Sequence, residues 1–261
     1  RTNGLYLLGS AGSRRALLHS RDGGMTFTAW MLPPGKARAS SFDIEQFSGH
    51  NVPEGPPPVA RYSLTATDPK LFWRRVHDIE LLLPSTDGDR IHFAAPALIS
   101  TQGIGLAMHP GIPATLASRG TRTHICWAEA TDPTAPVPGV PAFVATYAHG
   151  TGLTGPPALI GYGAPPNDIH NTPTLTIDGR GTLHALGGTH GKPFPYAASL
   201  EPDDAARGWT PPSATGPDLP QTYIGLVCGP DGTLHGAFRL WQRNREPFPL
   251  SHHATLAYQR K

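Results

Sequence analysis

The stretch PTLTIDGRGTLHAL, residues 173–186, decides the fold, and YIGLVCGPDGTLHGAF, residues 223–238, repeats its layout. Each stretch contains two short runs rich in apolar and β-branched residues, separated by an Asp-Gly pair. Asp-Gly between two such runs is a strong local signal for a tight turn. Both stretches are therefore predicted to be β-hairpins, each with a histidine on its second strand.

The pattern of a turn followed by a histidine recurs earlier in the chain, at residues 87–93 and 120–127. The four histidines of these hairpins are separated by 32, 60 and 51 residues; they are His92, His124, His184 and His235. Repetition at about 40–50 residues is typical of a β-propeller of four-stranded antiparallel blades. We expect one all-β domain over residues 1–261, with about five blade-like units, which could be part of a longer, seven-bladed ring. A β-sandwich with several similar hairpins is the alternative.

Composition supports a turn-rich, folded chain. Gly and Pro number 30 each in 261 residues, so almost no window of 12 residues could form an uninterrupted helix. A net charge of +2, from 21 Lys and Arg against 19 Asp and Glu, is too weak to indicate nucleic acid or an anionic membrane as a partner. No apolar run approaches the roughly 18–20 residues that span a bilayer, and no secretory signal opens the chain. Cys126 and Cys228 lie in apolar runs and are expected to be buried free thiols, with a disulfide as the alternative.

Residues 20–27, SRDGGMTF, fit the pattern S-x-D-x-G-x-T-[FW]. This pattern resembles the Asp-box repeats of sialidases and other Asp-box propellers. The resemblance implies that Asp22 shapes a turn between outer strands of a blade, so we do not expect it to be catalytic.

The region from residue 167 to residue 241 carries most of the chemistry-bearing side chains. It contains D-x-H-N-x-P, then G-x-H-G, and later T-Y followed by D-G-x-L-H-x-x-F-R. This order resembles the BNR-4 repeat proteins, a group similar to the β-propeller polysaccharide lyases that cut ulvan-type, rhamnose–glucuronate polymers. The resemblance covers about 75 residues well. It implies four catalytic residues, with 20 residues between the histidines and 16 between Tyr and Arg, namely His170, His190, Tyr223 and Arg239.

These residue types suit β-elimination at a 4-linked uronate. An Arg can neutralise the uronate carboxylate bidentately and keeps its charge. A base must remove the C5 proton and an acid must protonate the leaving O4; His can do either near neutral pH, and a Tyr hydroxyl beside a cation can do both in turn. Asn171 or Asn167 could hold the sugar by hydrogen bonds. The scheme requires no metal, although some relatives of these lyases carry a structural zinc, and a structural zinc or calcium ion is compatible with the resemblance. His50 with His252 and His253 is a zinc-ligand alternative whose spacing is not diagnostic.

Structural roles compete with each of these assignments. His170 could form a hydrogen bond to a strand edge, and His190 could stabilise its glycine-rich turn. Tyr223 could pack inside a blade, and Arg239 could pair with a carboxylate of the protein. The equivalent placement of the four hairpin histidines favours a structural role for them.

We therefore predict a polysaccharide lyase, with two alternatives. One is a glycoside hydrolase on the same scaffold, either sialidase-like or directed at rhamnose–glucuronate linkages, and the other is a non-catalytic propeller that binds glycan or protein. The expected partner is a polysaccharide, the expected state is a monomer, and the resemblance favours a secreted or periplasmic location.

Overall fold

The protein is described here by a computed structural model that covers the chain except residues 1–3, 36–38, 71–74, 108–112, 165–166 and 246–247, and that describes no side chains at 39–40 and 242–253. The described residues form β-strands and two short 3-10 helices, η1 (Ile169–Asn171) and η2 (Ala205–Arg207). The all-β prediction is confirmed. Among the described residues, no helix is long and apolar enough to cross a membrane.

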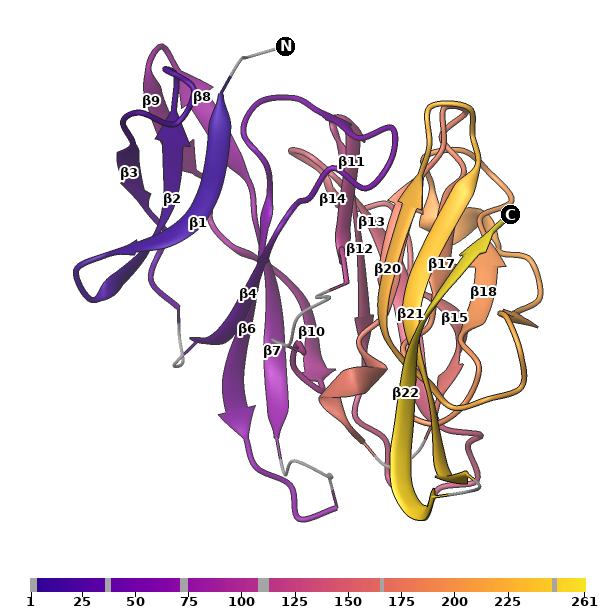
Figure 1. Cartoon of the computed structure of the whole chain (residues 1–261). Helices are drawn as coiled ribbons and strands as arrows, with labels where there is room; N and C mark the ends of the chain where they lie inside the picture. The colour runs from indigo at the N-terminus through magenta and orange to yellow at the C-terminus, as the bar shows by residue number, and fades with distance from the viewer. Residues whose placement is uncertain (1–3, 36–38, 71–74, 108–112, 165–166, 246–247) are drawn as a thin grey trace.

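The strands form five successive sheets along the chain (Figure 1). The first contains β1 (Leu5–Ala11), β2 (Arg14–Ser20) and β3 (Thr28–Met31). The second contains β4 (Ala39–Ile44), β6 (Val59–Ala66), β7 (Val76–Leu82) and β10 (Ala97–Gly103). The third contains β5 (Val52–Pro53), β11 (Leu116–Gly120), β12 (Arg122–Ala128), β13 (Val140–Ala148), β14 (Gly152–Leu153) and β15 (Ala158–Gly163).

The last two sheets hold both stretches that predicted the fold. The fourth contains β16 (Thr174–Ile177), β17 (Leu183–Leu186), β18 (Pro195–Ala198) and β19 (Ser213–Ala214). The fifth contains β20 (Gln221–Cys228), β21 (Leu234–Arg245) and β22 (Phe248–Arg260). A separate hairpin pairs β8 (Pro84–Asp87) with β9 (Arg90–Phe93). The sheets thus have three to six strands, where the sequence predicted four in each.

First strands of neighbouring sheets lie against one another, as in a β-propeller. Asp43 on β4 accepts hydrogen bonds from the backbone N–H and the hydroxyl of Thr115, next to β11, at 3.0 and 2.6 Å. Leu175 on β16 donates its N–H to the Ala114 carbonyl at 2.8 Å. The segment after β4 lies between β16 and β20, because Ser48 accepts the N–H of Cys228 at 2.8 Å and its hydroxyl reaches the Leu175 carbonyl at 3.3 Å. These contacts hold β16 beside β20, and η1, directly before β16, also contacts β20, which matters for the site.

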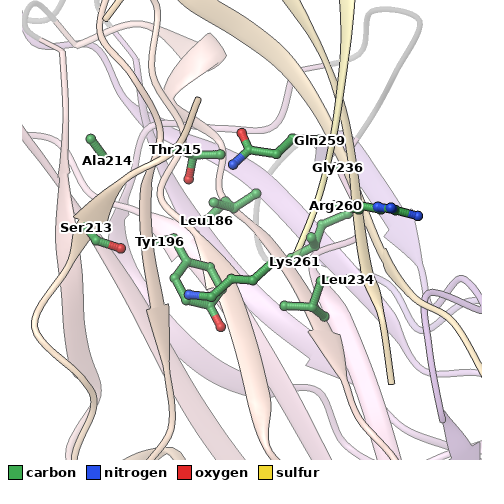
Figure 2. A pocket seen from close by; sticks show the side chains of 11 residues that line it. Leu186, Tyr196, Ser213, Ala214, Thr215, Leu234, Gly236, Gln259, Arg260 and Lys261 are labelled. Atoms are coloured by element: carbon green, nitrogen blue, oxygen red, sulfur yellow. The ribbon is translucent and has the colours of Figure 1, made fainter. Parts of the chain in front are cut away.

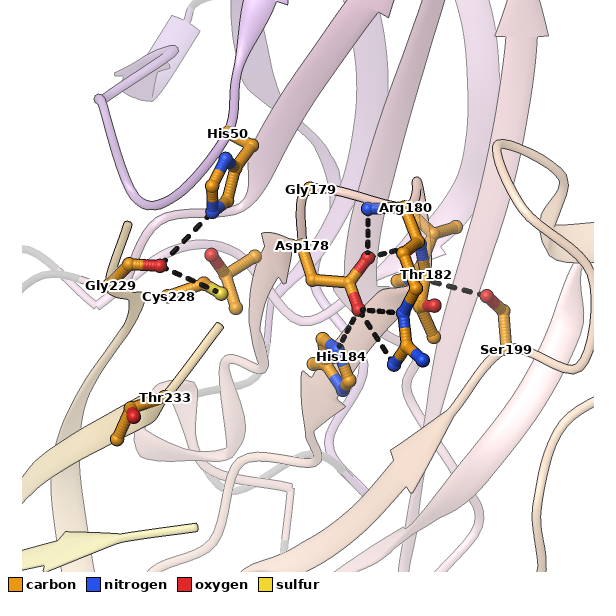
Figure 3. A network of polar contacts seen from close by, with 12 residues as sticks. His50, Asp178, Gly179, Arg180, Thr182, His184, Ser199, Cys228, Gly229 and Thr233 are labelled. Atoms are coloured by element: carbon orange, nitrogen blue, oxygen red, sulfur yellow. Dashed lines mark hydrogen bonds and ion pairs between the residues drawn. The ribbon is translucent and has the colours of Figure 1, made fainter. Parts of the chain in front are cut away.

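Aspartates organise the hairpin turns. The Asp178 carboxylate accepts the backbone N–H groups of Arg180 and Thr182 at 2.9 and 2.8 Å, between β16 and β17 (Figure 3). Asp231 accepts the Thr233 N–H at 3.0 Å between β20 and β21. Asp22 accepts the Thr26 N–H at 2.9 Å between β2 and β3. Each carboxylate satisfies turn donors that would otherwise lack a partner.

Hairpin histidines have recurring partners on the next strand. The His184 ring stacks on Tyr196, with Nδ1 2.8 Å from the Tyr hydroxyl, and the His235 ring stacks on Tyr258, with the same pair of atoms 2.6 Å apart. These two histidines therefore occupy equivalent places in successive sheets, as predicted. His92 differs, since it is exposed on the separate β8–β9 hairpin.

Apolar cores fill the spaces between sheets. One cluster joins the third and fourth sheets through residues such as Cys126, Ile160 and Leu175, all fully or almost fully buried. Another joins the fourth and fifth through Phe194, Cys228 and Phe238. Both cysteines are buried and free, as the sequence predicted.

Candidate functional site

The four residues predicted to be catalytic lie together. His170 is on η1, directly before β16, and His190 is in the turn that follows β17. Their ring centroids are 4.4 Å apart. The Tyr223 hydroxyl is 3.2 Å from His170 Nε2, and the Arg239 guanidinium carbon is 4.4 Å from the centre of the Tyr223 ring. The hairpin topology explains this meeting: the start of β16 and the end of β17 share one end of their sheet, next to the start of β20.

Asp168, to which the sequence analysis gave no role, holds both histidines. One carboxylate oxygen is 2.5 Å from His170 Nδ1, and the other is 2.7 Å from His190 Nδ1. The side chain is only 8% exposed. Burial alone would raise the pKa of Asp168, but the hydrogen bonds from the two imidazoles outweigh it and hold the pKa well below its usual range. Asp168 is therefore ionised and acts only as an acceptor.

Tyr223 owes its orientation to a bulge in β20. Its φ is +54°, a left-handed conformation shared by one other non-glycine residue, Asp203, among the described residues. The register of β20 against β21 shifts between Thr222 and Gly225 at this point. An aromatic residue rarely adopts this conformation. Backbone strain of this kind is common at functional sites, where it orients a side chain toward the site. Here the bulge directs the hydroxyl toward His170.

Arg239 lies on β21, half-buried beside Tyr223. Among the described residues, no carboxylate lies within salt-bridge distance of Arg239, and its Nε is buried without a hydrogen-bond partner. Tyr223 and Arg239 line an open groove of about 440 Å³, whose remaining described lining is apolar or small: Gly225, Ala237, Ala254, Thr255 and Leu256. The guanidinium charge is thus available to an anion in this groove.

The two predicted sugar-binding asparagines have backbone partners. Asn167 is 3% exposed; its side chain accepts the Thr131 N–H at 2.7 Å and donates to the Thr131 carbonyl at 2.5 Å. Asn171 is 1% exposed and donates its amide to the Asp168 carbonyl at 3.0 Å. The hydrogen bonds of both side chains stabilise the loop that carries Asp168 and His170.

Two glycines permit this loop to pack tightly. A Cβ at Gly188 would come closer than 3.0 Å to the backbone of Asn171 and Thr172, and one at Gly163 would meet the Asn171 side chain and the Gly188 carbonyl equally closely. Gly188, in the GGTHG turn, therefore allows the His190 loop to pack against the His170 loop.

Asp168, His170 and His190 are also the described residues best placed to hold a metal, since one ligand-type atom of each lies within 4.8 Å of the others. Two ligands of a tetrahedral zinc ion, at about 2.0–2.1 Å from the metal, would lie roughly 3.3 Å apart. The separations of 2.5 and 2.7 Å are hydrogen-bond distances instead. His50, the other zinc candidate, places Nε2 3.0 Å from the Gly229 carbonyl, whereas the side chains of His252 and His253 lie outside the described residues (Figure 3).

A second cavity, of about 260 Å³, lies between the fourth and fifth sheets (Figure 2). Its described lining includes Leu186, Tyr196 and Lys261, whose Nζ is 3.9 Å from the centre of the Tyr196 ring. None of the four predicted catalytic residues is part of that lining.

Sequence reasoning also missed Trp241, whose ring centroid is 5.8 Å from that of His190. Trp241 stands two residues after Arg239, so it projects to the same side of β21. The sequence also contains a signal for Asp168. In the D-x-H-N motif the aspartate stands two residues before a histidine, and from that position its carboxylate can reach the histidine ring.

No family model matches the chain, and no curated protein matches it. Among solved structures, the chain is similar to a polysaccharide lyase, described as an ulvan lyase bound to -[GlcA(1-4)Rha3S]-, with 20% identity over 61% of this chain and 37% of that one, at a TM-score of 0.44. It is similar to a Penicillium chrysogenum α-L-arabinanase complexed with arabinobiose, with 14% identity over 85% of this chain and 66% of that one, at a TM-score of 0.43. It is similar to the NanB sialidase of Streptococcus pneumoniae, with 11% identity over 95% of this chain and 35% of that one, at a TM-score of 0.47. The chain spans about one third to two thirds of the length of these structures, so the assignment of the site rests on its own geometry.

Proposed function

We propose that the protein is a polysaccharide lyase that cleaves a uronate-containing glycan by β-elimination. The observation that carries the proposal is the meeting of two imidazoles, a phenol and a guanidinium, of which the phenol and the guanidinium line the groove. Elimination at a uronate needs these groups: a cation for the carboxylate, a base for the C5 proton and an acid for O4.

Arg239 neutralises the substrate carboxylate in this proposal. A planar guanidinium can meet both carboxylate oxygens, and the developing negative charge at C5 is delocalised into that carboxylate. Its position over the Tyr223 ring brings the carboxylate, and with it C5, close to the phenol.

Tyr223 and His190 share the base and acid roles at the substrate. His170 is nearly buried, at 9% exposure, whereas His190 is 31% exposed. His170 Nδ1 donates to Asp168, so its Nε2 accepts the proton of the Tyr223 hydroxyl, 3.2 Å away. His170 therefore acts through Tyr223: it can take the phenol proton and return it. The C5–H bond breaks, the C4–C5 double bond forms, and O4 leaves with a proton.

The hydrolase alternative is less well supported. Glycoside hydrolysis ordinarily uses two facing carboxylic groups. The carboxylate in contact with this cluster, Asp168, is buried and accepts hydrogen bonds from two imidazoles. It is poorly placed to attack a sugar or to protonate a leaving group.

The test is incubation of the purified protein with glucuronate-rich polymers. A lyase product carries a double bond conjugated to the carboxylate, so ultraviolet absorbance rises and mass spectrometry finds no added water. Arg239→Lys keeps the charge but loses the planar fork, and Tyr223→Phe loses only the hydroxyl. Each should lower kcat/KM by about 10²-fold or more while leaving the melting temperature near that of the wild type. Saturated, hydrated products would support the hydrolase instead, and full activity in both variants would show that the site is wrong.

A further inference from the structure

We infer that Asp168 is a positioning residue that fixes both site histidines in one tautomer, with the proton on Nδ1 and the lone pair on Nε2. This inference rests on the proposed function for its consequence in catalysis, while its structural part can be measured without any substrate.

The hydrogen bonds define the protonation pattern. An ionised carboxylate can only accept, and its two oxygens each face the Nδ1 of a different imidazole. Each Nδ1 must therefore donate. The Nε2 of each ring is left as the basic nitrogen, and in His170 it accepts from Tyr223.

The surroundings hold Asp168 in place. As the N-cap of η1 it accepts the His170 backbone N–H at 2.9 Å, so its carboxylate is tied to the backbone of the residue that it orients. Its own carbonyl accepts the Asn171 side-chain amide. A short, buried and anchored carboxylate positions two rings 4.4 Å apart with little freedom for either to turn.

Asp168→Asn is the informative change because it preserves shape and alters hydrogen bonding. An amide has one accepting oxygen and one donating nitrogen. It can accept from one imidazole Nδ1–H, whereas its NH₂ requires a lone pair on the other ring's Nδ1. In one of the two histidines the proton must therefore move from Nδ1 to Nε2. That Nε2 can then no longer accept a proton from Tyr223 or from substrate.

The structural readout is long-range 1H–15N NMR of the histidine rings, with signals assigned from His170→Gln and His190→Gln. We expect both rings of the wild-type protein to show the Nδ1–H tautomer, and one ring of Asp168→Asn to show Nε2–H. Asp178→Asn is the matched control, since Asp178 is a turn carboxylate beside a different histidine, His184. It should leave the signals of His170 and His190 unchanged.

The catalytic readout is kcat and KM of the same variants. Loss of a correctly oriented base should lower kcat of Asp168→Asn by about 10²–10⁴-fold with little change in KM. Asp168→Glu keeps two accepting oxygens, so it should preserve the Nδ1–H tautomer of both histidines and recover part of kcat. If Asp168→Asn does not fold, the histidine tautomers and kcat of Asp168→Glu are the test instead.

Two results would overturn the inference: both rings retaining Nδ1–H in Asp168→Asn, or stoichiometric zinc binding that Asp168→Asn abolishes, which would make the carboxylate a metal ligand. If the tautomers change as expected but the wild type produces no unsaturated product, the positioning role stands and the proposed lyase function fails.

Discussion

Replacing Gly188 by Ala should separate the two loops that carry the site histidines. Gly188 has an ordinary backbone conformation, so only space opposes a methyl group there. That methyl would lie closer than 3.0 Å to the backbone of Asn171 and Thr172, where ordinary contacts are 3.4–4 Å. Backbone atoms cannot rotate away, so one loop must move by about 1 Å. Overpacking of this kind costs about 1–3 kcal/mol of unfolding free energy, and a 1 Å misplacement at a reacting group can cost about 10²-fold in rate.

The assay compares Gly188→Ala with Gly236→Ala on β21, where the nearest atom to a new Cβ is 3.8 Å away. Denaturant unfolding should show a loss of about 1–3 kcal/mol for Gly188→Ala and a much smaller change for the control. Turnover, measured at a temperature where both variants are folded, should fall about 10²-fold in Gly188→Ala only. If both variants match the wild type in stability and turnover, the loops do not pack as described, and the close approach of His170 and His190 loses its explanation.

Two further predictions concern residues outside the site. Asp22→Ala should lower the melting temperature without lowering turnover, because hydrogen bonds from Thr26 hold the pKa of Asp22 below its usual range and mark it as a turn residue; a variant with normal melting but no activity would contradict this. Burial lowers the pKa of His124 to about 3, so the folded protein keeps this ring neutral while the unfolded chain protonates it near pH 6.5. Its contribution to stability is present above pH 6.5 and is lost as pH falls toward 3; His124→Gln should flatten that part of the unfolding free energy measured against pH.

The hairpins were predictable because their signals are local. An Asp-Gly turn between two apolar runs specifies a hairpin wherever it occurs, and Asp178 and Asp231 behave accordingly. The number of strands in each sheet was not predictable in this way. Strands such as β5, which pairs in parallel with β11, and β15 join their sheet through long-range pairing that no short motif records.

The candidate site was likewise predictable only in part. The resemblance placed His170, His190, Tyr223 and Arg239, and the structure brings them together. Asp168 was overlooked because several aspartates in this chain organise turns, and composition cannot distinguish a carboxylate that accepts backbone N–H groups from one that accepts hydrogen bonds from two imidazoles. The asparagines were assigned to sugar because the sequence does not show that their amides are bonded to backbone groups.

The position along the sheet distinguishes the two hairpin histidines His184 and His235 from the two histidines of the proposed site. His184 and His235 lie within strands, where a tyrosine of the neighbouring strand stacks on each ring and bonds to its Nδ1. Such rings have one stacked face and one nitrogen committed to the neighbouring strand. His170 and His190 lie where strands begin and end, so the sheet ladder does not constrain them, and a buried carboxylate supplies the orientation that the ladder would have provided. A ring fixed by a charge at one nitrogen can offer the other to chemistry, whereas a ring fixed by stacking on a strand stabilises the blade.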